Sequence, residues 1–288
     1  MFARFSRGWA ITKASWSVLK QHPKLMLLPM ASSLALFTLL GMIGAGGYMG
    51  HKAGLFANVM VEDGEIPLGF YAILFAIYFL CSFVIVFFNA AMVFCSLQAF
   101  NGEEPSIGKG LSTAAGRLPQ ILAWSLLAST VGVLLSSLQE FLKDKLSIFG
   151  SLLGSLLEVS WALMTYFVVP VLVVDGVGPV EAVKRSSAIL KKTWGESLAG
   201  EGGMSAISFL LLFPVFLLVM LGMIAFKPTA PVLAWTIAAA VVPYAVAVTL
   251  VFATLGTIFR TGTYVYATTG KAPEAITTDL VAGAFRTK

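Results

Sequence analysis

Residues 147–200 read SIFGSLLGSLLEVSWALMTYFVVPVLVVDGVGPVEAVKRSSAILKKTWGESLAG, and this stretch decides the fold. Its first half, as far as Val174, is apolar and exceeds the roughly 20 residues that a helix needs to cross a bilayer. Its second half is amphipathic and too charged to lie in lipid. The two halves meet at the sequence DGVGP, residues 175–179. The pattern predicts a helix that crosses a membrane, followed by a helix that leaves it.

The composition extends this interpretation to the whole chain. Of its 288 residues, 58% are hydrophobic and only 11% are charged, whereas soluble domains carry about 25% charged residues. The net charge is +5, and isolated Lys and Arg residues stand beside the apolar runs. A membrane surface is therefore the expected anionic partner, and no nucleic acid is expected.

Six apolar runs of membrane length follow one another along the chain. We expect an all-α, polytopic single transmembrane domain over residues 1–288. Its spans are expected at about 25–48, 66–100, 120–138, 148–174, 204–226 and 232–259, with a short outer loop at 139–146. Amphipathic helices are expected at the cytoplasmic membrane interface. The first of them, within residues 1–24, places Phe2, Phe5, Trp9 and Trp16 on one face.

The distribution of basic residues predicts the orientation. The two termini and the loops after the second and fourth spans contain 15 of the 19 Lys and Arg residues. Basic residues are concentrated on the cytoplasmic side of membrane proteins. Both termini are therefore expected in the cytoplasm.

A short motif recurs where each even-numbered span ends. Gly102-x-x-Pro105, Gly176-x-x-Pro179 and Gly270-x-x-Pro273 share one spacing. Glycine supplies the left-handed residue that ends a helix, and proline is favoured in the first position of the next one. The motif predicts a three-fold internal repeat of interfacial helix, span, outer loop and span. The alternative is ordinary helix punctuation that recurs by chance.

Three segments carry a resemblance to a known family. They are FVVPVLVVDGVGPVEAVKRSSAILKKTWGESLAG, GWAITKASWSVLKQHPKLMLLP and YVYATTGKAPEA, which begin at residues 167, 8 and 264. The chain resembles an uncharacterised family of prokaryotic six-helix integral membrane proteins, distantly similar to the membrane domain of bacterial glycerophosphodiester phosphodiesterases. The resemblance implies the fold and the prokaryotic inner membrane, but no activity and no catalytic residues. Asp175 stands where that family pattern has a Glu.

One acidic side chain is expected within a span. An ionised carboxylate in the membrane is costly, so Glu158 is a candidate functional residue. Helical spacing puts it on one face with serines, beside Gly150 and Gly154, which suggests a packing face with a buried acid. It either binds a proton, a cation or a lipid headgroup, or it is a hydrogen-bonded strut between helices. The candidate ligand or ion residues are Glu158, Asn89, Ser151 and Ser155.

A basic cluster follows the fourth span. Lys184, Arg185, Lys191 and Lys192 are candidates for contact with anionic lipid headgroups. The alternative is that they only set the topology of the chain.

These features favour a non-enzymatic membrane protein that binds lipid or organises a membrane complex. The alternative is a small-solute or ion transporter or channel that uses Glu158. No enzyme is expected, because the spans contain no histidine and no nucleophile–base pair. No metal site or cofactor is expected either. The expected partners are membrane lipids, and beyond these a membrane protein or a second copy of the chain.

Overall fold

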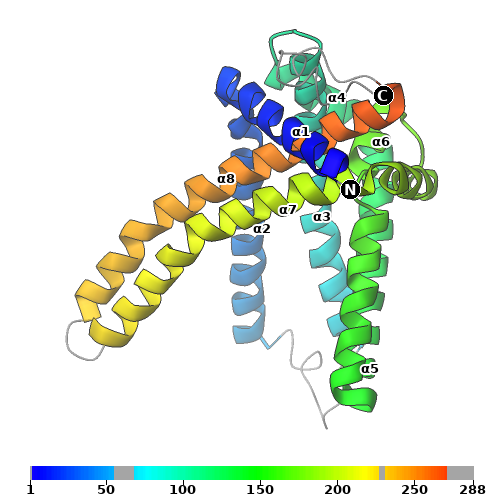
Figure 1. The fold of residues 1–288 in the computed structure, drawn as a ribbon. Coiled ribbons are helices and arrows are strands. Elements are labelled where there is room, and N and C mark those ends of the chain that lie inside the picture. The colour runs from blue at the N-terminus through cyan, green and yellow to red at the C-terminus, as the bar shows by residue number, and fades with distance from the viewer. Residues whose placement is uncertain (1, 55–67, 227–230, 271–288) are drawn as a thin grey trace. The chain divides into compact units, whose positions relative to one another are not determined.

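The computed structural model describes residues 2–54, 68–226 and 231–270, and within these ranges the chain is helical with no strand (Figure 1). In chain order the helices are α1 (Phe2–Gln21), η1 (Pro23–Met26), α2 (Leu27–Lys52), α3 (Leu68–Phe100), α4 (Ile107–Gly116), α5 (Leu118–Met164), α6 (Val168–Val174), α7 (Pro179–Phe226) and α8 (Pro231–Thr269). The predicted all-α class is confirmed.

Within the described residues, five stretches of helix are long and apolar enough to cross a membrane. They are Pro23–Lys52, Tyr71–Phe100, Leu118–Val174, Pro179–Gly222 and Ala239–Thr269. Large apolar side chains stay exposed on them; Phe37 and Ile148 are 75% and 83% exposed. Such surfaces suit contact with lipid, because soluble proteins rarely expose large contiguous apolar areas.

Helix α5 is folded back on itself. Ser147, with φ 50° and ψ −121°, is the position inside it that leaves helical geometry. Beyond Ser147 the chain runs antiparallel to its preceding arm, so that the rings of Trp124 and Trp161 stack with centroids 6.1 Å apart. The prediction of a loop at residues 139–146 is therefore wrong. This segment, QEFLKDKL, consists largely of good helix formers, and the helix continues to the turn.

Two further boundaries differ from the prediction. The expected span 148–174 is interrupted between α5 and α6, where the Phe167 N–H donates to Ser186 Oγ at 2.9 Å. The amphipathic segment and the fifth expected span lie in one helix, α7, with non-helical geometry at Thr193. A polar side chain from the amphipathic segment thus caps the interruption.

The chain forms two compact units. The first comprises residues 1–29, 95–105 and 192–288, and the second comprises residues 30–94 and 106–191. The expected single transmembrane domain remains a prediction. In the first unit α1 packs on α8. Helices α7 and α8 run side by side and antiparallel (Figure 1), with Gly200 against Phe259.

The glycines of the G-x-x-P motif have the predicted conformation. Gly102, Gly176 and Gly270 follow α3, α6 and α8 with φ of 73°, 65° and 72°. Each is therefore in the left-handed region, where glycine carries no Cβ penalty.

The prolines of the motif behave differently from one another. Pro179 is the first residue of α7, as predicted, whereas Pro105 lies two residues before α4, which is capped by Ser106. Pro273 lies outside the described residues.

Alanine substitution at two of these glycines is expected to have graded effects. Gly102→Ala meets open space and adds only left-handed strain, about 1–2 kcal/mol. Gly176→Ala adds the same strain, and its new Cβ also overlaps the Arg117 guanidinium. It is therefore expected to lower stability further. Unfolding in mild detergent measures both variants against the wild type, and equal losses would show that Arg117 moves aside at no cost.

Candidate functional site

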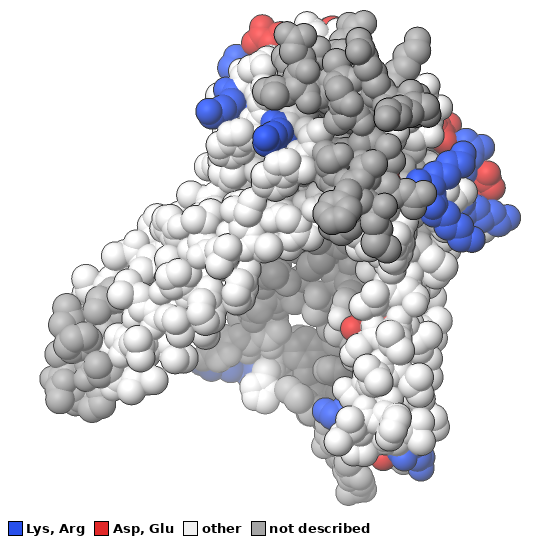
Figure 2. All heavy atoms as spheres, viewed as in Figure 1, with Lys and Arg blue, Asp and Glu red and all other residues white. Residues whose placement is uncertain are grey.

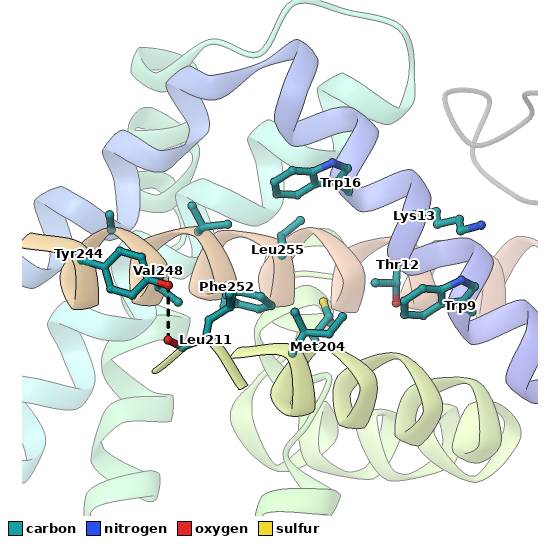
Figure 3. A pocket seen from close by; sticks show the side chains of 13 residues that line it. Trp9, Thr12, Lys13, Trp16, Met204, Leu211, Tyr244, Val248, Phe252 and Leu255 are labelled. Carbon is teal, nitrogen blue, oxygen red and sulfur yellow. Dashed lines mark hydrogen bonds between the residues drawn. The ribbon is translucent and has the colours of Figure 1, made fainter. Parts of the chain in front are cut away.

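An apolar groove lies between three helices of the first unit. It encloses about 570 Å³ and is lined by α1, α7 and α8 (Figure 3). Tyr244 marks one end, where its hydroxyl donates to the Leu211 carbonyl at 3.4 Å. Lys13 and Trp9 mark the other end. Between these ends the wall is almost entirely apolar, so the groove suits a hydrocarbon ligand.

Helix α1 supplies the polar end of this groove through a regular stripe. Trp9, Lys13, Trp16 and Lys20 follow one another at intervals of four, three and four residues, which places them on one helical face. All four are exposed; Trp9 and Trp16 are 44% and 45% exposed. The predicted tryptophan face is thus present, while the side chains of Phe2 and Phe5 lie outside the described ones.

The opposite face of α1 explains why the stripe points outward. It is buried and combines the small side chains Ala10, Ala14 and Ser15 with Ile11, Val18 and Leu19. Small residues allow two helices to approach closely. The helix therefore turns its small residues inward, and the tryptophans and lysines remain at the surface.

Three described carboxylates of the first unit have partners other than Lys13 and Lys20. Glu104 pairs with Lys24 at 3.4 Å, Glu103 accepts from Gln98 at 3.3 Å, and Glu201 pairs with Arg260. Lys13 makes no ion pair within the described part of the chain. The Lys20 Nζ lies 6.0 Å from the centre of the Trp16 ring, in cation–π geometry.

A second hollow runs along the seam between α7 and α8. It has a volume of about 370 Å³ and shares Met204 and Phe252 with the apolar groove. Its lining includes Glu201, Ser205 and Ser208 on α7. Since Arg260 neutralises Glu201, the polar part of this lining carries no net charge.

The predicted intramembrane site has a different environment from the one expected. Glu158, Ser151 and Ser155 are exposed, whereas the glycines beside them are buried. The expectation that the acid lies buried on the packing face is wrong, because the fold of α5 turns Gly150 and Gly154 inward instead.

Among the described residues, the hydrogen bond found between two candidates for ligand or ion binding lies within one helix. The Ser155 hydroxyl donates to the Ser151 carbonyl, a bond within its own helix. Asn89 is half-buried on α3. Among the described residues, neither Glu158 nor Asn89 makes a side-chain hydrogen bond. Their joint role as a ligand or ion site stays a prediction.

The predicted basic cluster lies exposed on α7. The side chains of Lys184, Lys191 and Lys192 are exposed. Arg185 is held by two carboxylates, Asp175 at 2.8 Å and Glu181 at 3.0 Å. Through its bond to Asp175, Arg185 stabilises the turn that precedes its own helix.

Sequence reasoning missed the groove. The α7 and α8 residues that line it are apolar residues within predicted spans, and no motif distinguishes them from the other apolar residues there. The Trp-Lys-Trp-Lys spacing on α1 was the available signal. Cys81 and Cys95 form no disulfide, and the described residues contain no cluster of His, Cys, Asp and Glu that could hold a metal ion.

These features define a class: an all-helical protein whose helices are apolar and long enough to cross a membrane, with an apolar groove between them. Residues 68–274 match a family of unknown function (DUF6159), and the chain belongs to that family. Searches among curated proteins and among solved structures return no match. The similarity to the membrane domain of glycerophosphodiester phosphodiesterases therefore remains a prediction.

Proposed function

We propose that this chain is a non-enzymatic integral membrane protein of the prokaryotic inner membrane, and that it binds membrane lipid in the groove between α1, α7 and α8. The observation that supports the proposal is the groove itself, whose apolar wall ends at lysine and tryptophan side chains. The ligand with matching chemistry is an amphiphile with a hydrocarbon chain and a polar head.

The proposed topology has six spans. Five apolar helical stretches are found, and α5 contributes two crossings because it reverses at Ser147. The left-handed glycines of the three G-x-x-P motifs, Gly102, Gly176 and Gly270, support a three-fold repeat. With both termini in the cytoplasm, α1 lies at the cytoplasmic interface, where tryptophan is enriched in membrane proteins.

The dimensions of the groove fit an acyl chain. Its α8 wall extends from Leu255 to Tyr244, which is about 16 Å at 1.5 Å per residue. Along this length α7 and α8 carry no charged residue between Met204 and Phe226 or between Val232 and Phe259. Their arm is accordingly white in Figure 2. We propose that the chain of the lipid lies along this wall and its head lies beside Lys13.

The groove differs from a general apolar surface in that it is concave. An acyl chain inside it contacts three helices at once, whereas a chain against a flat helix contacts one. Each buried CH₂ contributes about 0.8 kcal/mol relative to water. Relative to the bilayer the gain is smaller, and it comes from packing against the Trp16, Phe252 and Met204 side chains.

The transport alternative lacks a comparable observation. It needs Glu158 to meet polar groups that share a ligand, and Glu158 is exposed on its helix. The exposed lysines of α7, Lys184, Lys191 and Lys192, are proposed to attract the anionic membrane surface in general.

Filling the groove is expected to expel the lipid. Val248 lines the groove, whereas Val246, two residues earlier on α8, is 50% exposed and does not. In Val248→Trp the larger side chain occupies the space of the acyl chain. We expect native mass spectrometry of the gently extracted protein to show about tenfold less retained lipid.

Val246→Trp is the matched control, because it introduces the same side chain into the same helix. It is expected to retain lipid like the wild type. If Val248→Trp retained as much lipid as Val246→Trp, the groove would not be the binding site.

A further inference from the structure

We propose that the groove selects an anionic phospholipid, whose phosphate is bound by Lys13 and Lys20 of α1. This inference rests on the proposed function and names the headgroup class that the site takes. Lys13 is part of the groove wall, and Lys20 is held beside that wall by the Trp16 ring.

The spacing of the two lysines suits one headgroup. They lie seven residues apart on the same face of α1, which is about 10 Å along the helix. Trp16 stands between them, and its ring lines the groove. Because lysine side chains are long and flexible, both ammonium groups can reach a single phosphate that lies between them.

The charge distribution favours an anion from outside the chain. Residues 1–24 contain five basic residues and no acid. The described carboxylates Glu103, Glu104 and Glu201 have partners other than Lys13 and Lys20. The two ammonium groups thus stand beside an apolar groove without a carboxylate partner in the described part of the chain.

The same charges discriminate between headgroups. A zwitterionic phospholipid brings its own ammonium group, which two lysines repel. An anionic phospholipid brings only negative charge next to the phosphate. A basic residue near an anionic surface contributes about 1 kcal/mol, which corresponds to about a fivefold preference for each lysine.

The test is a competition in native mass spectrometry. The full-length protein, stripped of lipid in detergent, is given equal amounts of phosphatidylglycerol and phosphatidylcholine with identical acyl chains. We expect the wild type to retain the phosphatidylglycerol preferentially, by about twenty-five-fold. In the double variant Lys13→Gln, Lys20→Gln the ratio is expected to fall close to one, because phosphatidylglycerol loses the attraction of the two lysines and phosphatidylcholine loses their repulsion.

A charge-matched control removes two exposed lysines that do not line the groove. The double variant Lys52→Gln, Lys109→Gln is expected to keep the preference of the wild type. If the control lost the preference, or if the Lys13 and Lys20 variant kept it, the assignment to these lysines would be overturned.

The outcomes separate this inference from the proposed function. Equal retention of both lipids by the wild type, combined with expulsion by Val248→Trp, would overturn the headgroup selection and leave the groove as a lipid site. If Val248→Trp expelled neither lipid, the groove itself would be refuted.

Discussion

Gly200→Ala is expected to separate α7 from α8 in the first unit. A Cβ at this position would overlap the ring of Phe259, which is fully buried. Neither helix can easily withdraw, since Glu201 and Arg260, the next residue on each, are paired. Overpacking of this kind costs about 3 kcal/mol. We expect a clear fall in the unfolding midpoint in detergent.

Helix α7 also offers a control substitution, which is expected to raise the stability instead of lowering it. Gly202 has open space where its Cβ would be. Gly202→Ala therefore gains helix propensity, about 0.8–1.0 kcal/mol, without a clash. In the double variant Gly200→Ala, Phe259→Leu, the smaller side chain is expected to recover part of the loss. Additive effects of these two substitutions would show that the ring and the glycine are not in contact.

Gly150→Ala is expected to open the folded-back helix α5. The new Cβ would overlap the backbone carbonyl of Leu142, which cannot rotate away as a side chain can. The two arms must move apart, and the cost is expected to reach 3 kcal/mol or more, at the upper end of overpacking. The stacked rings of Trp124 and Trp161 belong to opposite arms, so their fluorescence reports on the separation of the arms. A changed tryptophan emission, together with lower stability, is the expected result.

The turn itself provides the comparison for Gly150→Ala. Ser147 has a positive φ, which glycine adopts without strain. Ser147→Gly is therefore expected to stabilise the protein, by about 1 kcal/mol. If Gly150→Ala were as stable as the wild type, the close approach of the two arms described here would be wrong.

The parts of the fold that depend on local chemistry were predictable. The second span was expected at 66–100, and α3 covers 68–100, because a long apolar run has no competing conformation. Gly102, Gly176 and Gly270 end their helices as expected, since only glycine takes the left-handed region without strain.

The parts that depend on tertiary packing were not predictable. Residues 139–146 are charged enough to resemble a loop, yet their helix propensity and the tight turn at Ser147 extend the helix. Glu158 was placed on a packing face by its spacing, but the glycines alone decide which side turns inward. The groove depends on the packing of α1 on α8, which lie more than 200 residues apart in the sequence. Hydrophobic periodicity does not predict which distant helices pack together.

The packing of α1 on α8 has a consequence for biogenesis. The ribosome synthesises α1 long before α8, and chains generally fold from the N-terminus as they emerge. The buried face of α1 therefore cannot pack against α8 until every intervening helix has been synthesised. The first unit is completed only after α8 has been synthesised. A truncated product that lacks α8 leaves this face of α1 uncovered.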